Sequence, residues 1–279
     1  MVSSEQRRKQ LAREKFERQR KRREAARRKA RIRNAAIALG VILVLVAGGA
    51  YAAGGGLNGD EKSDAKKDEA ADEQPSKAAD PCDKPAKGLP NGKRWKKEPS
   101  MRVDRSASYR MDLDTTCGRI GISMDAGKAP HTVNSFAFLA GQKFFDHTPC
   151  HRLAEDTKIH ILQCGDPQGT GQGGPGYTIP DENLKDPRIR GEKYPAGTVA
   201  MANQYDAKSG KGRDSGGSQF FLVFEDSELP PDYTPFGKIT EGMGVLKKIA
   251  KAGSTPDPRT RNTPPNATVM IDKATVRKS

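Results

Sequence analysis

The sequence predicts a mainly β fold: a closed antiparallel barrel with two helices, preceded by a single membrane-spanning helix and a tether. From Ser106 onward, short runs of alternating apolar and polar residues are separated by loops rich in Gly and Pro. Only two stretches of that part have helical spacing, and they begin at Pro130 and Met243. Upstream, the 19 uncharged residues Ala35–Ala53 are long enough to cross one hydrocarbon core as a helix.

The formal net charge of +14 is unevenly distributed along the chain. Residues 1–34 carry 15 Lys and Arg against four Glu, a net of +11, which leaves +3 for all later residues. Basic residues that stop at an apolar run are typical of a cytoplasmic flank. Because no nucleic-acid-binding motif accompanies them, we expect no nucleic-acid partner. We expect residues 1–34 to be a basic cytoplasmic tail and residues 35–53 to be an anchor in a lipid membrane.

A cleaved signal peptide is the alternative to a retained anchor. Ala50-Tyr51-Ala52 has the small-x-small form of a cleavage site. The basic flank and the apolar run are both longer than in a usual signal peptide. We therefore favour a single-pass protein of the cell membrane with its N-terminus in the cytoplasm and its later domain outside. Secretion after cleavage near Ala52 remains the alternative.

Residues 54–105 have the composition of a linker. Three glycines are followed by a segment rich in Asp, Glu, Lys, Ala and Pro, with few large apolar residues. Such a segment does not bury enough apolar surface to fold alone. The sequence therefore predicts a charged flexible tether, with a folded domain over residues 106–279.

The expected elements of that domain begin with two strands, SYRMDLDT and GRIGISMD, joined by a turn at residues 115–118. One helix begins at Pro130, whose missing N–H suits a first turn. A second helix runs from about Met243 to Ala252 and ends before Gly253. The further strand candidates are residues 150–153, 159–164, 198–202, 220–224, 236–239 and 269–276.

Seven motifs in this domain resemble those of the cyclophilin family, in family order and with near-family spacing. They are Cys150-His151-Arg152-Leu153, Gln163-Cys164-Gly165-Asp166, Gly169-Thr170-Gly171, Asp181-Glu182-Asn183, Val199-Ala200-Met201-Ala202-Asn203, Gly217-Ser218-Gln219-Phe220-Phe221 and Phe236-Gly237-Lys238-Ile239-Thr240-Glu241-Gly242. The resemblance covers the chain from about Ser106 to Ser279. It implies an eight-stranded antiparallel barrel capped by two helices, and a peptidyl-prolyl cis/trans isomerase, or rotamase, of a membrane-anchored prokaryotic form.

The implied reaction needs neither a metal nor a cofactor. An Xaa–Pro bond isomerises slowly because amide resonance is broken at the twisted transition state. A fixed guanidinium can then donate a hydrogen bond to the proline nitrogen, an interaction largely absent in the planar ground state. Arg152 occupies the position of the family's catalytic arginine. The expected partners are proline-containing polypeptides, bound by a monomeric domain that acts as a folding catalyst or chaperone outside the cytoplasm.

The resemblance also implies the residues around this arginine. Phe221 is expected to form the floor under the proline ring, while Gln163 and Gln219 orient Arg152 and the substrate carbonyl. The remaining substrate-binding positions are His160, where the family has Phe; Ile161, where it usually has Met; Leu229, where many members have Trp; Tyr233, where many have His; and Ala202 and Asn203.

Several departures from the family pattern lie at the rim of the expected pocket. His160 replaces an apolar wall residue, residues 154–158 lengthen one connection by about three residues relative to the common form, and the loop 204–216 is longer and more charged. These departures leave a second function open: a non-catalytic module that binds proline-containing segments. The retained Arg152 and Phe221 favour the enzyme.

Four cysteines allow two further hypotheses. Cys150 and Cys164, with His151 and His160, resemble a zinc set, but adjacent strand residues point to opposite faces, so we expect no metal site. The stretch from Cys150 to Cys164 is nearly symmetric about its centre, so a hairpin there would bring these cysteines together as a disulfide. With Cys82 and Cys117 included, three pairings remain open.

Overall fold

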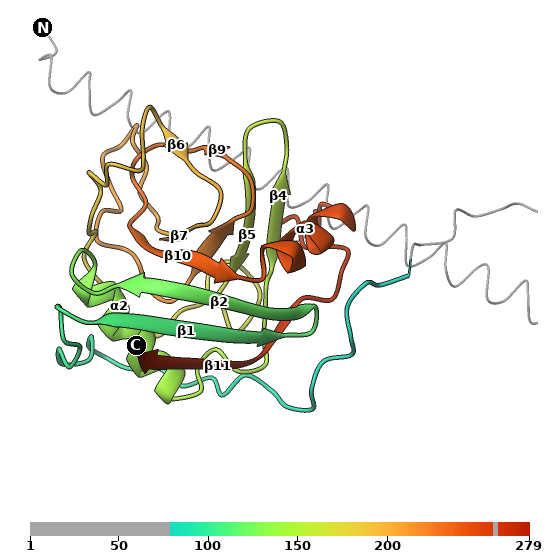
Figure 1. The fold of residues 1–279 in the computed structure, drawn as a ribbon, viewed down its shortest axis with the longest axis horizontal. Helices are drawn as coiled ribbons and strands as arrows, with labels where there is room; N and C mark the ends of the chain where they lie inside the picture. Colours follow the sequence, from blue (N-terminus) through green and yellow to red (C-terminus); the bar gives the residue numbers. More distant parts are fainter. Residues whose placement is uncertain (1–78, 259–261) are drawn as a thin grey trace, which may run out of the picture. The chain divides into compact units, whose positions relative to one another are not determined.

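A computed structural model describes residues 79–258 and 262–279 (Figure 1). All of these residues belong to the second of two units into which the chain divides, Glu73–Ser279. The expected basic tail 1–34, the anchor 35–53 and the first part of the tether, 54–78, lie outside the described residues. Within the described residues, no helix combines the length and the apolar character needed to cross a membrane.

The described residues fold into a mainly β structure with two helices. The strands are β1 Ser108–Thr115, β2 Gly118–Asp125, β3 Thr148–Pro149, β4 Arg152–Glu155, β5 His160–Cys164, β6 Lys193–Tyr194, β7 Thr198–Met201, β8 Phe220–Val223, β9 Ser227–Glu228, β10 Pro235–Glu241 and β11 Met270–Lys278; the helices are α2 Pro130–Gly141 and α3 Met243–Lys251. Nine strands form one antiparallel sheet in the order β3-β11-β1-β2-β10-β7-β8-β5-β4. Strands β6 and β9 form a separate pair.

The sheet curls, but its hydrogen-bonded ladder is not the closed eight-stranded barrel that the resemblance implied. Strands β3 and β4 are the two ends of the sheet, and only Cys150 and His151 separate them along the chain. Residues at this junction bond elsewhere: the N–H of Cys150 donates to Val269 O at 2.9 Å, and that of Leu153 in β4 donates to Thr263 O at 2.8 Å. An irregular segment after α3 thus takes the place of a final strand pairing beside β4.

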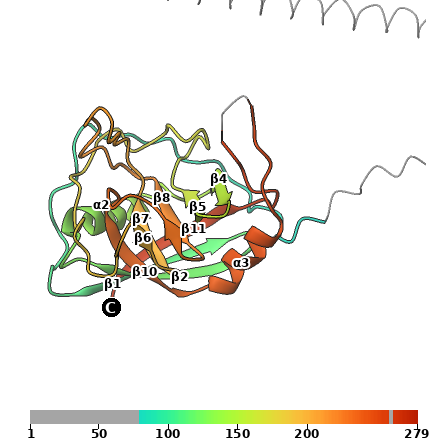
Figure 2. The same ribbon diagram turned by 90° about the horizontal axis from the view of Figure 1, so that it is seen from above.

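Helices α2 and α3 lie at opposite ends of the sheet (Figures 1 and 2). Helix α2 begins at Pro130 as expected, but its N-cap Ala129 offers no capping side chain. The carboxylate of Glu182 takes that role, accepting from the N–H groups of His131 at 3.0 Å and Thr132 at 2.9 Å. A residue of the Asp-Glu-Asn motif therefore serves the packing of this helix.

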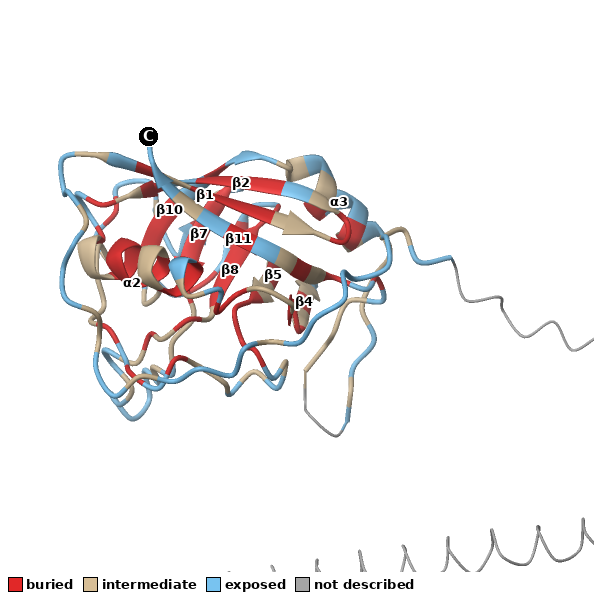
Figure 3. Ribbon diagram, turned by 90° about the horizontal axis from the view of Figure 1, so that it is seen from below, coloured by how far each residue is buried: buried red, intermediate tan, exposed pale blue. Residues whose placement is uncertain are grey.

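Alternation along the strands separates two apolar clusters, one on each face of the sheet. The main core includes Phe136 of α2, which packs against Phe220 and Phe236 at centroid distances of 5.4 and 4.7 Å. We call the smaller group the site cluster: Ile161, Tyr194, Ala200, Phe221, Val223 and Leu229. Figure 3 shows the buried residues gathered on α2 and on the central strands β7 and β8.

Residues 79–105, which the composition assigned to a flexible tether, lie against the sheet domain. A disulfide joins Cys82 to Cys117 at the β1–β2 turn. The ring of Trp95 packs edge-on against Phe138 of α2, with the centroids 5.1 Å apart. This stretch forms neither helix nor strand. Its attachment comes from one disulfide, one aromatic ring and polar contacts such as the ion pair of Glu98 with His131, so a low apolar content did not reveal it.

Candidate active site

Arg152 and Gln163 form the centre of the candidate site. They are directly paired in the ladder between β4 and β5, so their side chains share one face. Arg152 Nη1 donates to Gln163 Oε1 at 3.2 Å, and Gln163 Nε2 donates to Gln219 Oε1 at 2.9 Å. Gln219 Nε2 in turn donates to Gly173 O at 2.9 Å. This chain of side-chain amides runs from β5 to the glycine loop around Gly173, and it fixes the direction of the guanidinium.

The glycine loop at the end of this chain is built around Asp166. This carboxylate is fully buried and accepts from the backbone N–H groups of Gln168, Thr170, Gly171 and Gly173 at 2.7–3.0 Å. Burial raises the pKa of Asp166, but these hydrogen bonds outweigh it and leave the pKa below its usual value. The ionised carboxylate therefore holds the loop that receives Gln219.

The site cluster supplies an apolar surface next to the arginine. Phe221 lies opposite Gln163 in the ladder between β5 and β8 and is 2% exposed. Its ring meets that of Tyr233 edge-on, with the centroids 5.3 Å apart, and Ile161 and Leu229 belong to the same cluster. Leu229 is 8% exposed, so it contributes to the apolar cluster as a buried side chain. These positions can hold a proline ring by burial of apolar surface.

His160 packs against a ring outside the site cluster. Its ring is 5.9 Å from that of Phe224, which belongs to the main core. The period of two residues explains this placement: Ile161 faces the site, so its neighbour His160 faces away. Ile159, two residues before Ile161, packs against the site cluster instead. Ile159 therefore lies with Ile161 on the site face, and the binding role expected for His160 stays a prediction.

Ala202 and Asn203 lie near the two glutamines, and Ala202 also packs against the site cluster. Together with Gln163 and Gln219 they line an open cavity of about 480 Å³. The N–H of Ala202 donates to Gln219 O at 3.0 Å, and Asn203 Nδ2 donates to Asp232 O at 2.7 Å. The candidate site therefore has two parts, an apolar cluster and a polar cavity, joined by the glutamines.

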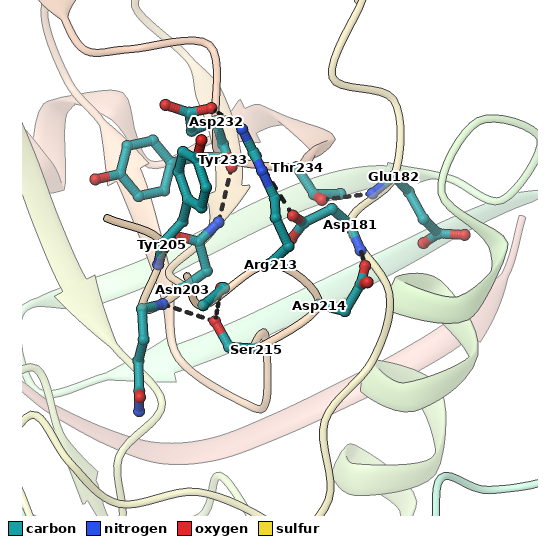
Figure 4. A network of polar contacts seen from close by, with 12 residues as sticks. Asp181, Glu182, Asn203, Tyr205, Arg213, Asp214, Ser215, Asp232, Tyr233 and Thr234 are labelled. Atoms are coloured by element: carbon teal, nitrogen blue, oxygen red, sulfur yellow. Dashed lines mark hydrogen bonds and ion pairs between the residues drawn. The ribbon is translucent and has the colours of Figure 1, made fainter. Parts of the chain in front are cut away.

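A charged network borders this second part (Figure 4). The guanidinium of Arg213, on the long loop 204–216, binds Asp232 and lies 3.4 Å from Asp181 Oδ2. The same group stacks over the ring of Tyr205, 3.4 Å from its centroid. Since Asp232 precedes Tyr233, the network ties the long loop to the wall of the apolar cluster.

The disulfide between Cys150 and Cys164 confirms the pairing expected from the hairpin. The register differs slightly from the expected symmetry, because Arg152 pairs with Gln163 and Leu153 with Leu162. Cys150 therefore lies just outside the ladder. Bonded cysteines are not thiolate ligands, which removes the chemical basis of the zinc set. The disulfide closes the base of the hairpin that presents Arg152.

An oriented guanidinium beside an apolar cluster is typical of a site that binds an apolar group and stabilises a polar centre next to it. The family model described as "Cyclophilin type peptidyl-prolyl cis-trans isomerase/CLD" matches residues 110–276. The chain therefore belongs to the cyclophilin-type peptidyl-prolyl cis-trans isomerase family, as the motifs had indicated.

Several relatives carry the name of this activity. The probable peptidyl-prolyl cis-trans isomerases B of Mycobacterium leprae and Mycobacterium tuberculosis are 45% and 44% identical over 155 residues. Each alignment covers 53% of this chain and 50% or 48% of the relative, so the chain spans about half the length of these relatives. A peptidyl-prolyl cis-trans isomerase of Helicobacter pylori is 39% identical over 140 residues, covering 49% of this chain and 77% of its own.

Among solved structures, a Cryptosporidium parvum cyclophilin type peptidyl-prolyl cis-trans isomerase is 26% identical. The match covers 62% of this chain and 99% of that protein, with a TM-score of 0.48.

Sequence reasoning found the central residues of the site and missed those that support them. Arg152, Gln163, Gln219 and Phe221 meet in space, joined by hydrogen bonds or ladder pairing. The side chains missed were Ile159, Asp166, Tyr194 and Arg213. Only Asp166 had a signal, its place in the Gln163–Asp166 motif. The others act through contacts between segments distant in sequence.

Proposed function

We propose that this chain is a peptidyl-prolyl cis/trans isomerase acting on Xaa–Pro bonds of polypeptides. The observation that carries the proposal is the hydrogen bond from Arg152 to Gln163 beside the apolar cluster around Phe221. Apolar burial holds the proline ring, and the guanidinium lies where a polar centre next to that ring can reach it. Membership of the family and the names of the relatives agree with this function.

The chemistry follows from the change in the amide during rotation. In the planar ground state the proline nitrogen shares its lone pair with the carbonyl, and in the twisted state the lone pair returns to nitrogen. A donor held by Gln163 then forms a hydrogen bond that strengthens only as the bond twists, which lowers the barrier. No covalent bond is made or broken, and no proton leaves Arg152.

An isomerisation assay with the full chain and an Xaa–Pro peptide tests this function. We expect Arg152→Ala to reduce kcat/KM by about 10²-fold or more, equal to about 3 kcal/mol of transition-state stabilisation. Arg105→Ala, an exposed arginine outside the site, is the matched control and should retain activity. A wild-type chain that binds the peptide without accelerating its isomerisation would instead be a non-catalytic binding module.

We further propose that residues 35–53 anchor the protein in the cell membrane, with residues 1–34 in the cytoplasm and the isomerase domain outside. The 19 uncharged residues behind a flank of net charge +11 support this topology. The two disulfides of the described domain also support it, because disulfides persist outside the cytoplasm.

Protease added to intact cells tests the topology. We expect digestion of the domain or of the segment before it, with the protein recovered in the membrane fraction. A soluble form in the medium that begins near Ala53 would indicate cleavage. Complete protection together with recovery in the cytosol would contradict both forms of the proposal.

A further inference from the structure

The cavity beside the two glutamines is lined by a charged side chain that does not come from the sheet. Arg94, from the segment before the first strand, is one of its lining residues. The cavity's other lining residues, all within the described parts of the chain, are uncharged: Gly, Pro, Ala, Ser, Thr, Asn, Gln and Tyr. Arg94 is therefore the one charged side chain that lines this cavity among the described residues.

Backbone contacts fix the position of Arg94. The N–H of Trp95 donates to Pro175 O at 2.8 Å. The segment runs so close to Gly176 that a Cβ there would lie 2.7 Å from Trp95 O and 3.3 Å from Arg94 Cβ. The ring of Trp95 is held by Phe138 on the other side. The backbone thus places the side chain of Arg94 at a defined point on the cavity wall formed by residues 173–178.

The charge of Arg94 is not neutralised by any other described residue. No hydrogen bond or ion pair engages its guanidinium in residues 79–258 and 262–279, and the side chain is exposed. The next residues, Lys96 and Lys97, are exposed and add charge of the same sign. The nearby carboxylates Asp181 and Asp232 already bind Arg213. An anionic group in the cavity would therefore meet an available guanidinium.

We propose that Arg94 selects polypeptide substrates with an acidic side chain, Asp or Glu, close in sequence to the isomerised Xaa–Pro bond. This inference rests on the proposed isomerase function and assigns a specificity-determining role to the segment before the sheet. The geometric reason is the short path between the two parts of the site: Gln163 touches Arg152 and also lines the cavity that contains Arg94. A polypeptide with its proline at Phe221 therefore presents neighbouring residues to this cavity.

The test compares peptides that share one Xaa–Pro bond and carry Glu, Ala or Lys at one of the three positions on either side of it. Using the full chain, kcat/KM and, by calorimetry, Kd are measured in low and high salt. At one of these positions we expect the Glu peptide to exceed the Lys peptide by about three- to tenfold in kcat/KM, since exposed ion pairs are weak. The ratio should approach one at high salt.

Two variants separate Arg94 from the general charge of the segment. Arg94→Glu should reverse the order of the Glu and Lys peptides. Lys96→Glu makes the same charge change at a residue that does not line the cavity, and should keep the wild-type order. Equal values for Glu and Lys peptides, or an equal effect of the two variants, would overturn the inference. If no peptide is isomerised, the proposed function fails, and the Kd values alone decide the role of Arg94.

Discussion

Arg152 and Gln163 lie directly opposite each other on β4 and β5, and Nη1 of the arginine donates to Oε1 of the glutamine at 3.2 Å. Because the amide of Gln163 also donates to Gln219, its oxygen can face only the guanidinium. The glutamine therefore orients the arginine and leaves its charge in place. A carboxylate in the same position would neutralise that charge. A donor that stays charged and fixed is what a developing lone pair requires.

Removing this glutamine should affect rate more than stability. In Gln163→Leu, we expect kcat to fall about tenfold with KM nearly unchanged, because Arg152 loses its orientation while the apolar cluster stays. The temperature midpoint of unfolding should shift little. Gln142→Leu, a polar-to-apolar change at the end of α2, is the control and should retain kcat. A larger change in KM than in kcat would show that Gln163 serves binding.

Much of the fold could be predicted because its signals are local. The hairpin β1–β2 matches the expected segments residue for residue, since alternation and a turn are both visible in sequence. Helix α2 begins at Pro130 and α3 spans Met243–Lys251, close to the expected range. The short strands β3, β6 and β9, two residues each, carry no alternation and were missed.

The failures concern contacts between distant segments. No motif indicated the contact of His160 with Phe224, because the period of the strand sets the face on which a side chain lies. Residues 79–105 were assigned by composition, which does not show that Cys82 bonds to Cys117. Arg94 and Arg213 had no motif at all, and only the folded chain brings them to the cavity and to Asp232.

The disulfide at the base of the β4–β5 hairpin should support both stability and activity. It joins cysteines with a sequence separation of 14, for which the loss of chain entropy in the unfolded state corresponds to about 3 kcal/mol. Replacing Cys150 and Cys164 together by Ser should lower the free energy of unfolding by about this amount and reduce kcat/KM. Denaturant titration and the isomerisation assay measure the two effects.

The second disulfide provides the comparison. Replacing Cys82 and Cys117 by Ser removes a bond far in sequence from Arg152, so we expect a loss of stability with kcat/KM preserved under native conditions. Equal activity in the two double variants would mean that the hairpin holds Arg152 without its disulfide.

The network around Arg213 should act on substrate binding. It joins the long loop to Asp181 and Asp232, next to the wall residue Tyr233. In Arg213→Ala, we expect KM to rise about threefold with little change in kcat, since the catalytic arginine is untouched. Arg213→Lys keeps the charge but loses the planar stacking on Tyr205, and should recover only part of the effect. An unchanged KM in Arg213→Ala would contradict this role.

Stability should fall as pH drops below neutrality, because of the buried His151. Its side chain is 4% exposed, and neither ring nitrogen has a hydrogen-bond partner among the described residues. Burial lowers the pKa of His151; Asp166 opposes this shift and Arg152 adds to it. The unfolded chain then binds a proton on this histidine near pH 6.5, whereas the folded chain does not. The contribution of His151 to the free energy of unfolding is therefore fully present above that pH and declines below it.

The decisive measurement is the slope of stability against pH, because a substitution in the core changes stability at every pH. Denaturant titrations between pH 7.5 and 5 should show a decline for the wild type and a much smaller one for His151→Gln. His160→Gln, whose ring packs on Phe224 at the same hairpin, should keep the wild-type slope. Carboxylates titrate mainly below this window, so their contribution stays small. If His151→Gln keeps the full slope, the proton is taken up elsewhere and the buried histidine does not govern acid stability.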